Sequence, residues 1–163
     1  MPHDTYEVHW KWRDDTPAPP GQVVIFDIDG VLADAAGRQH YLDWGDWKAF
    51  FDACGDDPVI AEIERLLELL DEKLLVVLVT ARPQRVQPHT LGWLARYGIR
   101  WNLLVMRAYG DFTSTDAFKR EVLSELRRRD YDVRLALDDD PKNHAMYVSE
   151  GVPCIYIHSG YYL

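Results

Sequence analysis

Short apolar runs rich in β-branched residues recur five times along the chain, and segments with helical periodicity separate them. The runs are VVIF (23–26), LLVVLV (74–79), LLVM (103–106), VRLAL (133–137) and CIYI (154–157). Each is too short for a core helix and is typical of a buried strand. Strands that alternate with helices predict an α/β fold: a doubly wound, Rossmann-like parallel sheet of about five strands with helices on both faces.

Helix signals fill the intervals between these runs. Helices are predicted over about 58–71, 88–97, 116–129 and 141–150. Asp57 is the expected N-cap of the first, with Pro58 at its first position, and Asp140 is the expected cap of the last, which begins at Pro141. Gly98 is expected just beyond the end of the second helix. The helices and strands together account for most of the chain after residue 21.

The length of 163 residues, with 47% hydrophobic residues, is that of one ordinary domain and excludes disorder as a class. Residues 1–21 end in the proline-rich stretch TPAPPG, which cannot continue as a helix. We therefore expect an N-terminal arm over 1–21 and one domain over 22–163. A small helical insert is expected at about 35–57. Neither interval between the motifs described below has room for a large cap domain.

Charge and cysteine content restrict the function classes. Eighteen Lys and Arg against 27 Asp and Glu give a net charge of −9, which argues against tight non-specific binding to nucleic acid or anionic membranes, although a local positive groove stays open. Cys54 and Cys154 have no partner at a metal-ligand spacing and indicate neither a zinc site nor a disulfide framework. No signal peptide or membrane span is evident. We therefore predict a cytoplasmic protein without a membrane partner.

Acidic residues follow two of the predicted strands. Asp27 and Asp29 come after the first run, and Asp138 and Asp139 come after the fourth. Ligands of open α/β sheets bind outside the carboxyl ends of the strands, where these side chains would meet. Carboxylates that crowd together raise each other's pKa unless a cation lies among them, and a site made only of oxygen atoms suits Mg²⁺. The pattern predicts a magnesium site at this edge.

Each of these segments also has an explanation without function. Asp-x-Asp-Gly is common turn chemistry, and residues 138–140 could serve only as a helix N-cap. Lys119 falls in the first turn of the predicted third helix, where the helix dipole disfavours a cation by roughly 0.3–1 kcal/mol. A nearby anion would explain this lysine, and so would a solvent-facing position. A common location at one sheet edge favours the functional interpretation.

Taken in order, these segments resemble the motifs of haloacid dehalogenase-type phosphatases. The matches are IFDIDGVL (25–32), Thr80 at a strand end, Lys119 near a helix start and the acidic pair Asp138 and Asp139. The resemblance spans residues 22–143. It implies a Mg²⁺-dependent phosphomonoesterase that works through an aspartyl-phosphate on Asp27.

The same resemblance implies a role for each matching residue. The catalytic set would be Asp27, Asp29, Thr80 and Lys119. The metal would be held by Asp27, Asp139 and the backbone carbonyl of Asp29, with Asp138 outside the direct ligands or linked to the metal through water. Six further residues are expected to contact the substrate: Gly30, Arg38, Trp44, Ala81, Arg82 and Asn143.

A narrower similarity is to the 3′-phosphatase domain of viral polynucleotide kinase-phosphatases. The shared segments are DGVLAD followed by Gly37-Arg38, TAR at 80–82, Trp93-Leu94, Gly110-Asp111, LALDDD and Ser159-Gly160. This implies a nucleic-acid 3′ end as the substrate. The sequence contains no Gly-x-x-x-x-Gly-Lys-(Ser/Thr) kinase motif, so a separate kinase or ligase of the same pathway is the expected partner. The alternative substrate is a free (deoxy)nucleoside monophosphate.

The expected insert is rich in aromatic residues: Tyr41, Trp44, Trp47, Phe50 and Phe51. Exposed rings would let bases stack, at roughly 1–3 kcal/mol per base. Positions 44, 47 and 51 also form a helical stripe, which is typical of a small satellite core. Both interpretations stay open from the sequence.

Two further classes of function compete with a phosphatase. A receiver-like signalling domain also gathers Asp, Thr and Lys at the end of a doubly wound sheet. Its lysine, however, follows its last strand, whereas Lys119 precedes the acidic run. A non-catalytic binding protein would have no need for all of Asp27, Asp29, Thr80 and Lys119.

Overall fold

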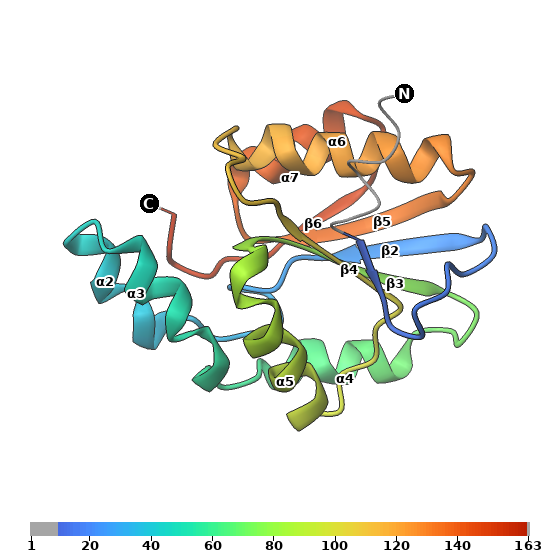
Figure 1. The fold of residues 1–163 in the computed structure, drawn as a ribbon. Helices are drawn as coiled ribbons and strands as arrows, with labels where there is room; N and C mark the ends of the chain where they lie inside the picture. Colours follow the sequence, from blue (N-terminus) through green and yellow to red (C-terminus); the bar gives the residue numbers. More distant parts are fainter. Residues whose placement is uncertain (1–9, 163) are drawn as a thin grey trace.

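The computed structural model describes residues 10–162, which form a six-stranded sheet in the order β1-β4-β3-β2-β5-β6 (Figure 1). Five of the strands run parallel: β2 (Gln22–Phe26), β3 (Leu75–Pro83), β4 (Leu103–Arg107), β5 (Asp132–Asp138) and β6 (Cys154–Tyr156). They coincide with the five predicted strands. The doubly wound α/β architecture is therefore confirmed.

Strand β1 (Trp10–Trp12) is the element that sequence analysis missed. It pairs antiparallel with β4, with Trp10 opposite Val105 and Trp12 opposite Leu103. It lies within 1–21, so the expected arm contributes an edge strand to the sheet. A three-residue strand with a lysine at its centre is too short to register as an apolar run. Residues 1–9 of the expected arm lie outside the described part.

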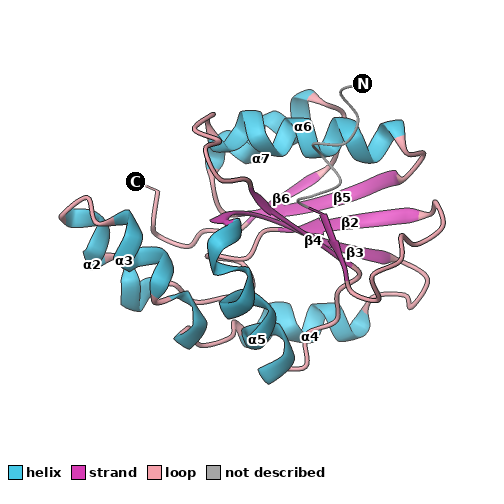
Figure 2. Ribbon diagram, viewed as in Figure 1, coloured by secondary structure: helices cyan, strands magenta, loops and turns pink. Residues whose placement is uncertain are grey.

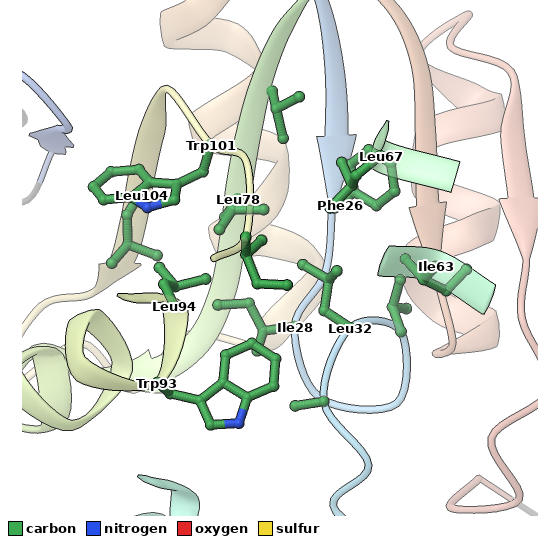
Figure 3. Packing of buried hydrophobic residues seen from close by; sticks show 14 of the residues in the cluster. Phe26, Ile28, Leu32, Ile63, Leu67, Leu78, Trp93, Leu94, Trp101 and Leu104 are labelled. Atoms are coloured by element: carbon green, nitrogen blue, oxygen red, sulfur yellow. The ribbon is translucent and has the colours of Figure 1, made fainter. Parts of the chain in front are cut away.

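Two pairs of helices cover the two faces of the sheet (Figure 2). Helices α4 (Ala61–Leu69) and α5 (Gln87–Arg96) lie on one face, and α6 (Thr115–Arg128) and α7 (Pro141–Ser149) lie on the other. Side chains of α4 and α5, among them Ile63, Leu67 and Trp93, pack on Phe26 and Leu78 of the sheet (Figure 3). None of the helices described between residues 10 and 162 combines the length and the apolar character needed to cross a membrane.

The helix boundaries agree with prediction at α7 and differ at α4. Asp140 caps α7 by accepting a hydrogen bond from the Lys142 backbone N–H. Helix α4 begins at Ala61, three residues later than predicted, because Ile60 donates its N–H to the carbonyl of Leu32 in the loop after β2. Asp57 is therefore not an N-cap, and its side chain is buried elsewhere.

The insert between β2 and α4 consists of short helical segments at the carboxyl edge of the sheet (Figure 1). They are η1 (Ala36–Arg38), α2 (His40–Asp43), α3 (Trp47–Asp52) and η2 (Cys54–Asp56), and a further turn, η3 (Gln84–Val86), precedes α5. Asp46 caps α3 through the Ala49 backbone N–H, 3.0 Å away. The insert is thus ordered by local capping and stands beside the site.

Strand β1 yields a stability prediction. Trp12 is buried and packs its ring on Tyr131, with ring centroids 5.8 Å apart. Trp12→Ala should lower the free energy of unfolding by about 3 kcal/mol, because it removes a large buried side chain and leaves a cavity. Urea denaturation followed by circular dichroism measures the change. Trp44→Ala is the control, since Trp44 is 85% exposed and should alter stability little. Equal loss in the two variants would contradict the packing described for β1.

Candidate active site

Three buried carboxylates meet where β2 and β5 end. Asp27 directly follows β2 and is fixed by its own backbone N–H, which donates to the Leu137 carbonyl at 3.1 Å. Asp138 is the last residue of β5, and Asp139 comes next. One oxygen atom from each of these three aspartates lies within 4.8 Å of the others. The parallel pairing of β2 with β5 therefore brings residues more than a hundred positions apart into one cluster.

The electrostatics of this cluster favour a cation. Burial, together with the charge of Asp138, raises the pKa of Asp27, and burial also raises the pKa of Asp139. Both carboxylate oxygens of Asp139 are buried and have no fully formed hydrogen bond with any residue between 10 and 162, although the nearby Ser159 side chain lowers the pKa of Asp139 in part. Carboxylate oxygens that lie close together and lack fully formed hydrogen bonds are suitable ligands for a hard divalent ion such as Mg²⁺.

Asp138 differs because its oxygens already have donors. It accepts from Lys119 Nζ at 2.7 Å, from the Asp140 backbone N–H at 2.9 Å and from Asn143 Nδ2 at 3.2 Å. Its position therefore suits holding Lys119 in place more than binding a metal directly. Asn143 thus contacts Asp138, the residue that also binds Lys119.

Lys119 lies at the centre of this arrangement. It is the fifth residue of α6, one position further into the helix than predicted, because Ser114 caps a helix that starts at Thr115 and not at Asp116. Its side chain is 1% exposed, and Nζ lies 3.1 Å from Asp27 Oδ1. Burial lowers the pKa of Lys119, but the charges of Asp138 and Asp27 outweigh burial and raise it. A charged ammonium is therefore fixed beside Asp27, and the solvent-facing interpretation is wrong.

Asp29 lies two residues from Asp27 but in the opposite electrostatic environment. Its Oδ1 accepts from the terminal nitrogens of Arg38 and Arg82, each at 2.7 Å. Burial would raise the pKa of Asp29, but the two guanidinium groups outweigh it and the pKa is lowered. Both arginines are buried and neither lines the cavity described below. They lie where they orient Asp29, and the substrate contact expected of them stays a prediction.

Asp57 is a residue that sequence analysis assigned wrongly. Its carboxylate forms a bidentate ion pair with Arg38, accepting from Nε at 2.8 Å and from a terminal nitrogen at 2.6 Å. It also accepts from a terminal nitrogen of Arg82 at 3.4 Å. Its backbone carbonyl accepts from the Trp93 indole at 2.8 Å. The Asp-Pro pair typical of a helix start concealed this role. The one available signal was that Arg38 and Arg82, if buried, would need more than a single counter-charge.

Gly30 is required by geometry. Its φ is +83°, and a Cβ built there would lie 2.1 Å from Asp139 Oδ2. The loop after β2 can approach the end of β5 only because this residue has no side chain. Gly30 therefore contributes to the site by letting Asp27 and Asp139 come together, whereas the sequence predicted a substrate contact.

A cavity of about 240 Å³ opens above the carboxylates. Its lining includes Asp27, Asp29, Thr80, Ala81, Lys119 and Asn143, six of the twelve predicted site residues. Thr80 Oγ1 accepts from the Arg82 backbone N–H at 3.1 Å, which leaves its hydroxyl proton available to a ligand. A larger cavity of about 550 Å³ lies between β4 and α6 and has none of the predicted site residues, so size alone does not identify the site.

The aromatic residues of the insert divide between the two interpretations. Phe50 is buried, and the Arg38 guanidinium lies 4.5 Å from the centre of its ring, as in a satellite core. Trp47 lines the cavity and is 58% exposed. Trp44 is 85% exposed and lies outside the cavity lining, contrary to its predicted place at the substrate. Tyr161 and Tyr162 also line the cavity, and no sequence motif had indicated them.

Fold and site together define a phosphatase of the haloacid dehalogenase type. The model for the phosphatase domain of polynucleotide kinase PNKP matches residues 21–162, so the chain belongs to this family. The family match also sets aside the receiver-like and non-catalytic alternatives.

Solved structures agree with this assignment. A chain of the Pnkp1/Rnl/Hen1 RNA repair complex is 26% identical, with a TM-score of 0.73 over 90% of this chain and 45% of that one. A second structure of a Pnkp1/Rnl/Hen1 complex gives 25% identity and a TM-score of 0.71 over 87% of this chain and 47% of the other. This chain thus spans about half the length of those two. A phosphoglycolate phosphatase-like protein from Lactobacillus plantarum shares the fold, at 14% identity and a TM-score of 0.61 over 86% of this chain and 88% of that one.

The approach of the loop after β2 to β5 can be tested at Gly30. Gly30→Ala should abolish phosphatase activity on p-nitrophenyl phosphate, because the new methyl group would displace the Asp139 carboxylate. Gly37→Ala is the matched control: Gly37 has no atom within 4 Å of its built Cβ among the described residues, so activity should persist. Initial rates, with circular dichroism to verify folding, provide the measurement. A fully active Gly30→Ala enzyme would show that this close approach is unnecessary.

The buried cluster around Asp57 generates a second prediction. Asp57→Ala should lower the free energy of unfolding by about 3 kcal/mol, because it leaves the Arg38 guanidinium buried without its main partner. Asp52→Ala serves as the control. Asp52 pairs with Lys48 and Arg85 on the surface, where ion pairs contribute little. Urea titration of both variants would show whether the loss is confined to the buried pair; similar stabilities would contradict it.

Proposed function

We propose that this protein is a Mg²⁺-dependent phosphatase that removes the 3′-phosphate from nucleic-acid ends through an aspartyl-phosphate intermediate. The observation that carries the proposal is the position of Asp27: a carboxylate at the floor of the cavity, 3.1 Å from a buried ammonium and beside the orphaned oxygens of Asp139. In-line phosphoryl transfer needs a nucleophile, a fixed positive charge and a carboxylate that can bind a metal ion. Membership of the PNKP phosphatase family supports the choice of substrate.

In the first step, an oxygen of Asp27 attacks phosphorus and the bond to the leaving 3′-oxygen breaks. Asp29 gives its proton to that oxygen, so the leaving group departs as a neutral hydroxyl. Asp29 takes up this proton from solvent when the substrate binds, because the phosphate dianion beside it opposes its ionisation, and it returns the proton to solvent after phosphate leaves. Arg38 and Arg82 keep Asp29 pointed at the cavity. Thr80 and Lys119 would bind the non-bridging oxygens, where charge is spread in the transition state.

In the second step, water attacks the phosphorus of the aspartyl-phosphate. Asp29, now a carboxylate again, accepts a proton from that water, and the Asp27–phosphorus bond breaks. Inorganic phosphate leaves and the Asp27 carboxylate is restored. The lowered pKa that the arginines give Asp29 keeps it ionised between turnovers.

The metal would be held by Asp27, Asp139 and the backbone carbonyl of Asp29, with Asp138 acting through water. When bound, Mg²⁺ supplies neutralisation of negative charge on the transferring group. Asp138 keeps Lys119 in place through the 2.7 Å contact, whether or not it reaches the metal.

We also propose that residues 22–163 act as one phosphatase domain in the cytoplasm, alongside a kinase or ligase of the same repair pathway. The similarity to Pnkp1 chains solved with Rnl and Hen1 in an RNA repair complex supports a partnership of this kind. A second candidate substrate is a free (deoxy)nucleoside monophosphate, which the net charge of −9 favours because a polyanion would be repelled.

The nucleophile can be tested by substitution. Asp27→Asn should abolish phosphate release from a 3′-phosphorylated oligonucleotide, because an amide cannot form the acyl phosphate. Asp29→Asn should slow release from the oligonucleotide and should retain phosphate on the protein when p-nitrophenyl phosphate is the substrate, since that leaving group needs no proton and only the second step stalls. Asp52→Asn, an exposed acid of the insert, is the control and should keep activity. Measurements with Mg²⁺ and with a chelator test the metal. Turnover by Asp27→Asn would exclude this mechanism.

The substrate is tested with a panel. Single-stranded DNA and RNA with 3′-phosphates are compared with nucleoside 3′- and 5′-monophosphates, as kcat/KM with Mg²⁺. The end-repair proposal requires the oligonucleotides to be the better substrates. Faster hydrolysis of the mononucleotides would replace it with the second candidate.

A further inference from the structure

We infer that the cavity above the carboxylates is a nucleoside site, in which the base next to the scissile phosphate stacks on aromatic side chains from the insert and from the segment after β6. The inference rests on the proposed function and names a contact that none of the sequence motifs contains. It follows from which residues share the cavity.

Two segments far apart in the sequence bring aromatic rings to one cavity. Helix α3 contributes Trp47 and Phe51, whose rings are stacked with centroids 6.0 Å apart and planes 28° apart. The segment after β6 contributes Tyr161 and Tyr162. Trp47 is 58% exposed and Tyr162 is 46% exposed, so both keep ring surface for a ligand. These rings share the cavity with the residues proposed to bind phosphate. A nucleotide has the matching parts, because a sugar joins its flat base to a phosphate.

The segment after β6 is held against the site. Tyr161 donates its hydroxyl to Asp34 Oδ1 at 3.3 Å, which links it to the loop that leads into the insert. Its backbone N–H donates to Ser159 Oγ at 3.3 Å. Burial and the charges of Asp139 and Asp27 raise the pKa of Tyr162, so its phenol stays neutral next to the carboxylates. Neutral rings can stack on a base without adding to the negative charge of the floor.

The geometry of the cavity restricts the ligand. Its lining includes Asp27, Thr80 and Lys119 together with the aromatic residues, so a phosphate bound at the first three shares the cavity with the attached nucleoside and the rings. Stacking uses the π-face, which every base has, so little base preference is expected. A terminal base in a duplex keeps its outer π-face but brings its paired base with it, and a cavity of about 240 Å³ that also holds the phosphate has no room for both. The cavity therefore favours an unpaired 3′ end.

An oligonucleotide that lacks only its last base tests this inference. Wild-type protein is given a single-stranded 3′-phosphorylated oligonucleotide and the same strand with an abasic terminal residue. The intact strand should have a kcat/KM on the order of 10-fold or more higher, given what one stacked base contributes. Trp47→Ala and Tyr162→Ala should each reduce that ratio toward one. Trp44→Ala and Tyr109→Ala, whose rings are exposed and outside the cavity, should leave the ratio at the wild-type value.

The outcomes separate this inference from the proposed function. An equal kcat/KM for both strands, or an unchanged ratio in the Trp47→Ala, Tyr162→Ala double variant shown by circular dichroism to be folded, overturns the nucleoside site and leaves the phosphatase intact. If nucleoside monophosphates are the better substrates but still outperform ribose phosphate through Trp47 and Tyr162, the nucleoside site stands and the 3′-end proposal falls. A blunt duplex hydrolysed as fast as a single strand would contradict the requirement for an unpaired end.

Discussion

The structure depends on how the negative charge of three aspartates is balanced at the carboxyl ends of β2 and β5. Asp27, Asp138 and Asp139 are buried within reach of one another, and water cannot screen their repulsion. Lys119 offsets part of that charge, and a divalent ion would offset the rest. Gly30, after Asp29, is a condition for this cluster to form, because a Cβ there would lie 2.1 Å from Asp139 Oδ2.

The two acids of the first loop show how one short segment supports two chemical roles. Asp27 lies among carboxylates and has a raised pKa, whereas Asp29 lies between two arginines and has a lowered one. Titratable groups whose surroundings push their pKa values apart are suited to different tasks in one reaction. Asp57 helps to keep the two pKa values apart, because it is a second buried anion for Arg38 and Arg82 and fixes the direction of both guanidinium groups.

The sheet, its helices and the carboxylate cluster could be predicted because each is encoded locally, in apolar runs and in the residues that follow them. The rest depends on contacts between distant segments. Strand β1 exists only through its pairing with β4, and Asp57 carries a local helix-start pattern that the fold overrides. Arg38 and Arg82 were identified as important, but whether a guanidinium faces a ligand or a neighbour is decided by packing. Tyr161 and Tyr162 reach the site through the path of the chain after β6, which no motif records.

Within residues 10–162, the two outer strands of the sheet span three residues each. Strand β1 covers the side of β4 that would otherwise present its backbone groups and the apolar sequence LLVM to solvent. An open edge of that kind is a template for pairing with another molecule. Strand β1, which is short and has a lysine at its centre, is a poor template for such pairing. Strand β1 thus disfavours edge-to-edge aggregation at this side of the sheet. The carboxyl ends of β2 and β5 stay free for chemistry.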